Sequence, residues 1–278
     1  MSKIIVLGAS GMLGTAICEQ LKNHNLQAHT SASLDILCSQ KLHEAVATFK
    51  PDYIINCAAY TAVDSAESNK ERAYAINATA VEKLAQIANQ FGATLIHFST
   101  DYVFDGNATT PYRVNYPTAP INVYGASKLA GEEAIRRTGS AHYIFRVSWL
   151  FAPHGKNFFR WVAETDMEEL NIVDSQTGSP TSALDVAAFI KHLIKNDPAV
   201  YGTYHFTNTG SCTWFAFAKA INDKLSLNKK INPVASFKTA AARPTYSLMD
   251  CSETEKTFDY KIPSIEDGLE HVIKSYKS

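Results

Sequence analysis

The feature of this sequence that most limits its fold is an alternation of short apolar runs with helical patterns through the first half of the chain. The apolar runs are KIIVL, QAHTS, DYIINCA, TLIHFST and HYIFRVS, at residues 3–7, 27–31, 52–58, 94–100 and 142–148. The helical patterns between them cover about residues 15–24, 39–49, 70–91 and 122–134. Strict alternation of this kind predicts βαβ units and a buried parallel sheet, covered by helices on both faces. We therefore expect an α/β fold built on a doubly wound parallel sheet.

The pattern becomes less regular beyond about residue 151. A helix could begin at Asp185, and Ser211 or Thr213 could cap another, because such side chains accept hydrogen bonds from free helical amides. We expect a first domain over residues 1–150 and a second, smaller, mixed α/β domain over residues 151–278. Whether segments of the second domain return to the first stays open.

Composition limits the partners of the chain. Its formal net charge is -1, with both signs interspersed, which argues against nucleic acid and anionic membranes as partners. No run of 18 apolar residues occurs, and the apolar run in the opening MSKIIVLGASG is too short for a signal peptide. We expect a cytoplasmic protein that binds a small molecule, with its oligomeric state open. Five scattered cysteines and nine dispersed histidines predict reduced thiols and no metal site.

A glycine-rich stretch, VLGASGMLG, lies between the first apolar run and the first helical pattern. Gly8, Gly11 and Gly14 would permit a tight turn, a close approach to a pyrophosphate, and a helix whose first amides face the anion. The spacing is GxxGxxG, not the commoner GxGxxG, and a plain tight turn is the alternative. We expect a bound dinucleotide here. The contacts would come from Gly8, Ser10, Gly11, Met12, Leu13 and Gly14.

The second apolar run ends in HTSAS and carries no acidic residue at its tip. An acidic residue there would bind the ribose 2′-hydroxyl of NAD. A strand end without one can accept the 2′-phosphate of NADP, because no carboxylate repels it. Ser31 and Ser33 could line that phosphate, although no arginine lies close in sequence. We therefore expect NADPH, with NADH as the alternative, and Asp35 could meet the adenine edge.

Tyr124 and Lys128 lie four positions apart in the helical stretch NVYGASKLAGEEA and would share one face of the helix. An ammonium beside a phenol favours the phenolate, so Lys128 would lower the pKa of Tyr124 and let it transfer protons near neutral pH. A packing aromatic and a solvated lysine are the alternatives. Thr100 ends the fourth apolar run, at the sheet edge where open α/β proteins bind ligands.

Four longer segments resemble the extended short-chain dehydrogenases/reductases, in the order and approximate spacing of that family. They are INCAAYTAVDSAES, HFSTDYVFDG, PINVYGASKLAGEEA and IFRVSWLF, starting at residues 55, 97, 120 and 144. The likeness is to the branch that reduces a dTDP-linked 4-keto-6-deoxy sugar, and KNFF, GSPTS and RPTYSLMD look like its substrate-domain markers. The resemblance implies a Rossmann fold, NADPH-dependent reduction of dTDP-4-dehydrorhamnose to dTDP-rhamnose, and a role in cell-surface polysaccharide biosynthesis.

The resemblance also implies roles for particular residues. The catalytic set would be Thr100, Tyr124 and Lys128, with Tyr124 as proton donor and Lys128 also hydrogen-bonding the nicotinamide ribose. Further cofactor contacts would come from Asp35, Ile36, Ala58, Ala59, Tyr60 and Thr61. Thr100 would hydrogen-bond the C4 oxygen of the substrate.

Other substrate contacts are expected from four residues, each with a structural alternative. Asp101 would contact sugar hydroxyls or cap a turn, and Trp149 would stack on the sugar or base or pack in the core. Arg243 offers a guanidinium suited to a diphosphate, with a surface salt bridge as the alternative. Asn157 is a weaker candidate for the same pocket. In addition, Asn77 could hold a water in a proton relay or face solvent.

Two departures from the family pattern limit what can be transferred. Thr15 and Ala16 stand where some members carry acidic residues of a metal-bridged dimer, so neither metal nor dimer is expected. Met249 replaces a common leucine, which changes little. Two other functions stay open: a non-catalytic regulatory subunit similar to the β-subunit of methionine adenosyltransferase, and an epimerase, dehydratase or reductase acting on another nucleotide sugar.

Overall fold

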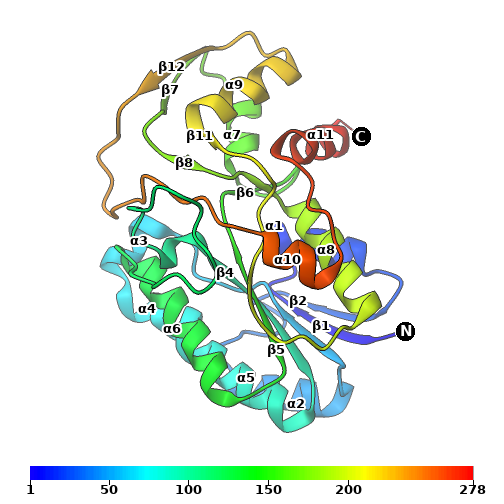
Figure 1. Cartoon of the computed structure of the whole chain (residues 1–278). Helices are drawn as coiled ribbons and strands as arrows, with labels where there is room; N and C mark the ends of the chain where they lie inside the picture. Colours follow the sequence, from blue (N-terminus) through cyan, green and yellow to red (C-terminus); the bar gives the residue numbers. More distant parts are fainter. Residues whose placement is uncertain (278) are drawn as a thin grey trace.

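A six-stranded parallel sheet lies at the centre of the structure, a computed structural model that describes residues 1–277 (Figure 1). Its strand order is β10-β5-β4-β3-β1-β2, and every neighbouring pair is parallel. The strands span Lys3–Leu7 (β1), Asn25–His29 (β2), Tyr53–Asn56 (β3), Thr94–Thr100 (β4), His142–Val147 (β5) and Gly202–His205 (β10). The order extends outward from β1 in both directions, which confirms the predicted doubly wound α/β fold.

The prediction that all five apolar runs are buried on both faces is right for four of them and wrong for β2. Nearly every residue of β1, β3, β4 and β5 is buried, as expected for interior parallel strands. The residues of β2 are exposed or half-buried because this strand forms one edge of the sheet. The opposite edge is β10, which comes from the second half of the chain and pairs with β5.

Helices cover both faces of the sheet (Figure 1). One face carries α2 (Ser39–Phe49), α5 (Ala80–Phe91) and α6 (Val123–Thr138), and the other carries α1 (Met12–Gln20), α8 (Ala183–Asn196) and α10 (Ser252–Phe258). Ile4 and Val6 belong to the apolar cluster under α1 and α8, whereas Ile5 and Leu7 belong to the cluster under α2 and α5. This division follows from the two-residue period of a strand.

The helix predicted over residues 70–91 is interrupted. α4 (Lys70–Tyr74) continues into a π-helical segment, η1 (Ala75–Thr79), before α5 begins, and a short α3 (Val63–Ser68) precedes them. π-helical segments are rare and are frequent at functional sites. Here the segment contains Asn77.

A second lobe lies above the sheet in Figure 1 and has its own apolar cluster, formed around Phe151, Phe159, Leu170, Phe217 and Leu269. β7 pairs in parallel with β12, β6 pairs in parallel with β9, and β8 pairs with β11 in antiparallel. The elements are β6 (Leu150–Phe151), α7 (Phe158–Glu164), β7 (Glu169–Val173), β8 (Thr177–Gly178), β9 (Thr181–Ser182), β11 (Cys212–Thr213), α9 (Trp214–Leu225), β12 (Lys230–Val234) and α11 (Ile265–Tyr276).

The helix starts predicted in this half are close to those observed. Thr213 caps α9 by accepting a hydrogen bond from the amide of Ala216. α8 begins at Ala183 and is capped by Ser182, slightly before the predicted start at Asp185.

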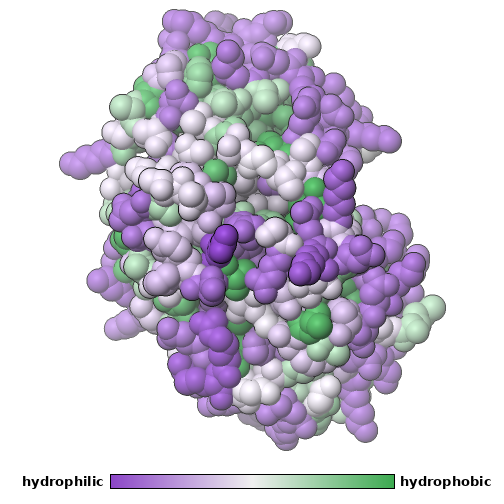
Figure 2. Space-filling view, viewed as in Figure 1, coloured by the Kyte–Doolittle hydropathy of each residue, from purple (hydrophilic) through white to green (hydrophobic). Residues whose placement is uncertain are grey.

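On the face shown in Figure 2, hydrophilic side chains are interspersed with strongly hydrophobic ones that form only small separate patches. Within residues 1–277, no helix combines the length and the apolar character needed to cross a bilayer. The same residues contain no group of three or more His, Cys, Asp or Glu side chains arranged to hold a metal ion.

Candidate active site

Many of the residues predicted to bind the dinucleotide line one cavity of about 350 Å³ at the carboxyl edge of the sheet. Its walls include Ser10, Gly11, Met12, Leu13, Ala58, Ala59, Thr61, Tyr124 and Lys128. Three segments far apart in the sequence, the glycine loop, the loop after β3 and the start of α6, thus meet around one space. That these residues contact a cofactor stays a prediction.

The glycine loop has the close backbone packing that a pyrophosphate site requires. Gly8 has a φ of +73°, and a Cβ there would lie 2.7 Å from the backbone nitrogen of Ala58. A Cβ on Gly14 would lie 2.2 Å from the carbonyl oxygen of Gly8, so only glycine lets α1 approach the loop this closely. Within the described chain no side chain caps the first amides of α1, which suits them to an anion. The residues present therefore fit a dinucleotide.

The loop after β3 is held in place by Asn77. Asn77 Oδ1 accepts a hydrogen bond from the amide of Tyr60 at 2.8 Å, and its Nδ2 donates to the Tyr60 carbonyl at 3.0 Å. The same Nδ2 donates to Ser127 Oγ of α6 at 2.9 Å. The sequence offered Asn77 as a water-holding or solvent-facing side chain. The second alternative is wrong, because Asn77 is 1% exposed and links the loop to α6.

Asp35 and Ile36 lie apart from this cavity. The side chain of Ile36 is buried in the apolar cluster under α2, and Asp35 Oδ1 accepts a hydrogen bond from the amide of Leu37 at 2.9 Å. Ser33, a predicted phosphate contact, closes a local turn in which its Oγ accepts from the amide of Thr30 at 3.0 Å. The cofactor contacts of these residues stay predictions.

Lys128 is buried instead of solvated. Its Nζ lies 3.2 Å from His97 Nε2. One turn later on α6, Glu132 is also buried and forms two hydrogen bonds with Arg146, at 2.9 and 2.8 Å. Burial lowers the pKa of Lys128 to about 8, although the charge of Glu132 and the nearby Cys57 act in the opposite direction.

The prediction that Lys128 lowers the pKa of Tyr124 is wrong, because the pKa of this phenol is raised. Burial raises the pKa of Tyr124 to about 12; the hydrogen bond with Thr100 lowers it, and the Asp101 carboxyl raises it. The phenol is therefore protonated at neutral pH. Since reduction of a ketone requires a proton donor, this protonated form is the useful one.

Thr100 and Asp101 lie where β4 passes into a 3₁₀ turn, η2 (Asp101–Val103). The Thr100 hydroxyl donates to Asp101 Oδ1 at 2.9 Å and accepts from the amide of Tyr102 at 3.2 Å. Asp101 is 2% exposed, and its Oδ2 has no hydrogen-bond partner among residues 1–277. Burial raises the pKa of Asp101 to about 6, while the hydroxyls of Thr100 and Ser247 lower it.

Trp149 and Asn157 have structural partners of their own. The Trp149 ring stacks on Trp214, with centroids 3.7 Å apart, and its backbone φ of +47° is unusual for a bulky residue. Gly178 packs against this ring so closely that a Cβ would lie 2.5 Å from it. Asn157 caps α7, since its Oδ1 accepts from the amide of Arg160 at 3.2 Å. Capping thus accounts for Asn157 without a substrate.

Arg243 forms the salt bridge that the sequence left as an alternative. Its Nη2 lies 2.8 Å from Asp64 Oδ2, and the hydrogen bond from Arg243 holds the pKa of Asp64 at about 2. Arg243 also borders a second cavity, of about 510 Å³, in the upper lobe. The other walls are mostly apolar and include Phe158, Trp161, Met167, Leu170, Ile172, Trp214 and Phe237.

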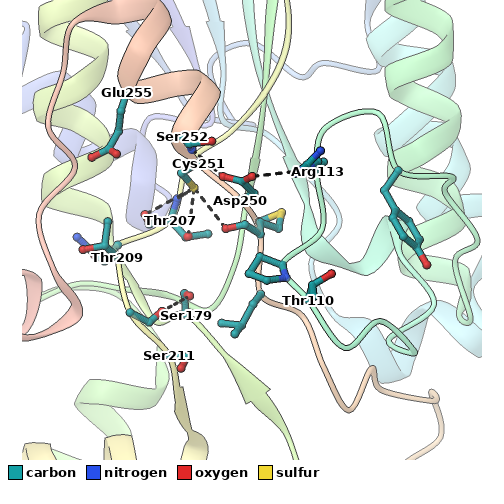
Figure 3. Close-up of a pocket in the computed structure, with 16 residues that line it drawn as sticks. Thr110, Arg113, Ser179, Thr207, Thr209, Ser211, Asp250, Cys251, Ser252 and Glu255 are labelled. Atoms are coloured by element: carbon teal, nitrogen blue, oxygen red, sulfur yellow. Dashed lines mark hydrogen bonds and ion pairs between the residues drawn. The ribbon is translucent and has the colours of Figure 1, made fainter.

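A third and larger cavity, of about 730 Å³, contains none of the predicted site residues (Figure 3). Its walls come from the stretches around Thr110, Thr209 and Asp250. The polar groups that line it are largely paired with one another: Asp250 faces Arg113 at 4.0 Å, and Cys251 Sγ accepts from the amide of Thr207 at 3.3 Å.

Sequence reasoning missed several residues of the candidate site. The pairing of β3 and β4 places Asn56 beside His97, and the packing of α6 on β4 places His97 beside Lys128. Trp214, which stacks on Trp149, comes from a helix start much later in the chain. Asn56 and His97 lie in two of the segments noted for the resemblance, and Lys156, which lines the same cavity as Tyr124, begins the noted KNFF marker.

Comparisons with known proteins agree with this geometry. The family model described as RmlD substrate binding domain matches residues 2–278. The dTDP-4-dehydrorhamnose reductase of Escherichia coli (strain K12) is 37% identical over 288 residues, covering 97% of this chain and 96% of that protein. The crystal structure of dTDP-4-dehydrorhamnose reductase from Bacillus anthracis in complex with NADP is 38% identical, with a TM-score of 0.93 over 99% of each chain.

A second solved structure, of the dTDP-4-dehydrorhamnose reductase from Clostridium acetobutylicum, is 34% identical with a TM-score of 0.94 over 99% of each chain. The fold and the site define an NADP-dependent oxidoreductase of the extended short-chain dehydrogenase/reductase class. Within that class, the chain belongs to the RmlD substrate binding domain family.

Proposed function

We propose that this chain reduces the C4 ketone of dTDP-4-dehydrorhamnose with NADPH and so produces dTDP-rhamnose for cell-surface polysaccharide. The observation that carries the proposal is the cavity in which the glycine loop, Ala58, Tyr124 and Lys128 meet. The names of the similar reductases, and the NADP complex of the Bacillus anthracis enzyme, support it.

The residues of the cavity have distinct tasks. Amides of the glycine loop and the start of α1 bind the pyrophosphate, and Lys128 donates to the ribose of the nicotinamide half. NADPH, when bound, supplies a hydride to the ketone carbon. Tyr124 donates its proton to the ketone oxygen, which is favourable because a sugar alkoxide is more basic than a phenolate. Thr100 hydrogen-bonds the same oxygen and fixes its position.

The second cavity is the proposed site of the dTDP moiety. Its aromatic walls, among them Phe158, Trp161 and Trp214, suit a flat base. Arg243 at its border would bind the diphosphate, whose two phosphates would compete with Asp64 for the guanidinium. Asp101 and Trp149 would contact the sugar. We also propose a cytoplasmic location, since NADPH-dependent chemistry and five free thiols suit a reducing compartment.

The test is NADPH oxidation driven by dTDP-4-dehydrorhamnose, compared between the native chain and Tyr124→Phe. We expect the variant to keep its affinity for NADPH and to lose about 10² to 10⁴ in turnover, because only the donated proton is removed. Tyr74→Phe changes an exposed tyrosine of α4 and serves as the matched control. Unchanged turnover in Tyr124→Phe would refute the role of the phenol. A stoichiometric enzyme partner in a pull-down, without sugar-dependent oxidation, would instead support the regulatory alternative.

A further inference from the structure

A line of buried hydrogen bonds connects the loop after β3 with Lys128. The amide of Ala58 donates to Asn56 Oδ1 at 3.1 Å, and Asn56 Nδ2 lies 3.1 Å from His97 Nδ1. His97 Nε2 lies 3.2 Å from Lys128 Nζ. Asn56, His97 and Lys128 are 1%, 0% and 2% exposed, so each polar atom depends on its protein partner.

The direction of the donors in this line is fixed at the Ala58 end. A backbone amide can only donate, so the carbonyl oxygen of the Asn56 side chain faces Ala58 and its amide group faces His97. His97 Nδ1 must then accept. Burial, followed by the charge of Lys128, holds the pKa of His97 well below its ordinary value, so the ring is neutral. A neutral imidazole that accepts at Nδ1 carries its hydrogen on Nε2, which points at Lys128.

We propose that His97 is a positioning residue for Lys128: its Nε2–H donates to the unprotonated amine and holds Lys128 ready to give up a proton. A donor that faces an ammonium has no acceptor, whereas a donor that faces a neutral amine finds a lone pair. The hydrogen-bond line therefore favours the neutral form of Lys128 over the charged form.

The inference rests on the proposed function and gives this neutral form a place in the reaction. When Tyr124 has protonated the substrate oxygen, it remains as a phenolate. The Lys128 ammonium passes one proton to that oxygen and becomes an amine, which accepts the hydrogen bond from His97 Nε2–H. Solvent then returns one proton to Lys128, and the pair is restored.

Two other groups near Lys128, Glu132 and Cys57, also affect its pKa. Glu132 on α6 favours the ammonium. Burial raises the pKa of Glu132, but Arg146 from β5, which binds both its oxygens, together with Ser99 and Arg136 outweighs burial, so this pKa stays below its ordinary value. Burial raises the pKa of Cys57, after β3, and its thiol is uncharged. The interactions of Lys128 with these two groups oppose the lowering of its pKa by burial.

The first test is a measurement on the native chain, and a variant serves only to assign its signal. Full-length protein labelled with ¹⁵N-histidine is studied by long-range ¹H–¹⁵N correlation at pH 9, above the pKa of about 8 for Lys128. We expect an unprotonated Nδ1 and a protonated Nε2 for His97, assigned by the signal missing from His97→Gln. A protonated Nδ1 would overturn the inference and leave the proposed reductase function untouched.

The second test compares two substitutions in the pH profile of kcat/KM. His97→Asn can still reach Asn56 but not Lys128, whereas the longer His97→Gln can place an amide N–H near Lys128. We expect His97→Asn to raise the pKa of Lys128 by about one unit and to move the corresponding limb of the profile with it. In His97→Gln, we expect this pKa to stay close to that of the native chain. Equal profiles for both variants, or lower turnover with no shift in either, would overturn the inference. An inactive native chain would overturn the proposed function but not the NMR result.

Discussion

At the scale of the residue, Asp101 illustrates a site side chain that lowers the stability of the fold. Its carboxyl is buried, and one of its oxygens has no hydrogen-bond partner in the described chain. Burial raises its pKa from 3.8 to about 6. The folded-state pKa therefore lies above the unfolded one. The free energy of unfolding is not reduced by this group below pH 4, where the carboxyl is protonated in both states, and it falls as pH rises through 6.

We predict that Asp101→Asn stabilises the chain at pH 8 by about 3 kcal/mol, the free energy equivalent to the shift in pKa. The amide keeps an acceptor for Thr100 and carries no charge. The gain should disappear near pH 4, where the native carboxyl is protonated. Urea unfolding at both pH values measures it, with the exposed Asp166→Asn as control. A variant no more stable than the native chain at pH 8 would show that the buried charge of Asp101 does not destabilise the fold.

Sequence spacing predicted those site residues whose partners lie close to them in the sequence. The glycine loop, and the pair Tyr124 and Lys128, could be predicted because a turn and a helix bring their members together. His97 and Asn56 could not, since strand pairing joins these two residues and the packing of α6 on β4 brings His97 to Lys128. The pKa of Tyr124 was mispredicted for the same reason: burial decides it, and burial is a property of the whole fold.

At the scale of the element, α6 is the part of the site whose position is most closely specified. Asn122 caps it by accepting from the amide of Gly125 at 2.8 Å, and Glu67 accepts from the amide of Val123 at 2.8 Å. Two glycines let other backbone segments approach the helix. A Cβ on Gly125 would lie 2.1 Å from the Tyr102 carbonyl oxygen, and one on Gly131 would lie 2.1 Å from the Asn77 carbonyl oxygen.

We predict that Gly131→Ala displaces α6 from η1 and lowers both stability and turnover. The added methyl group would meet backbone that cannot rotate away, so we expect a loss of about 1 to 3 kcal/mol. Turnover should fall more than affinity for NADPH, because Lys128 lies on the same helix. Thermal unfolding and single-turnover rates check both effects. Glu133→Ala, on the exposed side of α6, is the control and should stay within about 0.5 kcal/mol of the native chain.

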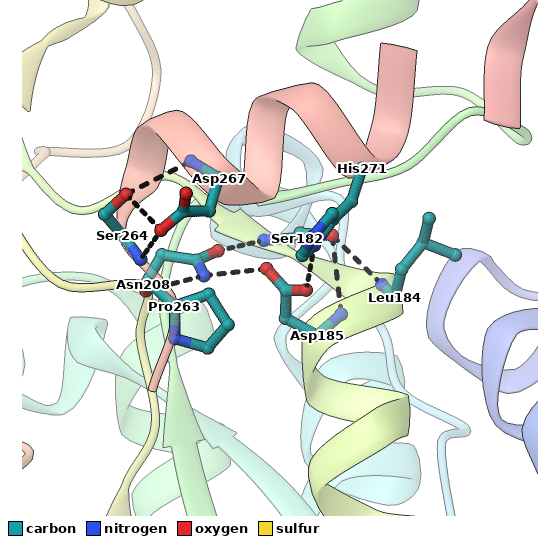
Figure 4. Close-up of polar contacts among 8 residues, drawn as sticks. All are labelled: Ser182, Leu184, Asp185, Asn208, Pro263, Ser264, Asp267 and His271. Atoms are coloured by element: carbon teal, nitrogen blue, oxygen red, sulfur yellow. Dashed lines mark hydrogen bonds and ion pairs between the residues drawn. The ribbon is translucent and has the colours of Figure 1, made fainter. Parts of the chain in front are cut away.

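At the scale of the whole molecule, several elements of the second half of the chain belong to the first lobe. α8 covers the face of the sheet that also carries α1, and β10 forms an edge of that sheet. A buried polar network fastens this region to α11: Asp185 accepts from Asn208 at 2.8 Å and lies 2.8 Å from His271 (Figure 4). Gly268 packs against Asn208, where a Cβ would lie 2.7 Å from its Oδ1. The periodicity of the sequence shows α8 as a helix but not the sheet on which it packs.

The division at residue 150 stays a prediction, and we do not expect it to mark an independent folding unit, because α8 and β10 return to the first lobe. A fragment of residues 1–150 would expose the apolar face that α8 covers in the full chain, including the surroundings of Ile17 and Phe145. We predict that this fragment binds hydrophobic dyes and lacks a cooperative thermal transition. A longer fragment, residues 1–205, regains α8 and β10 and should recover ordered structure by circular dichroism.

The full chain should unfold in one step, whether unfolding is followed by circular dichroism or by the fluorescence of Trp149, Trp161 and Trp214, which all lie outside the first five strands. A stably folded fragment of residues 1–150, or two separate transitions in the full chain, would instead show that the lobes are independent domains.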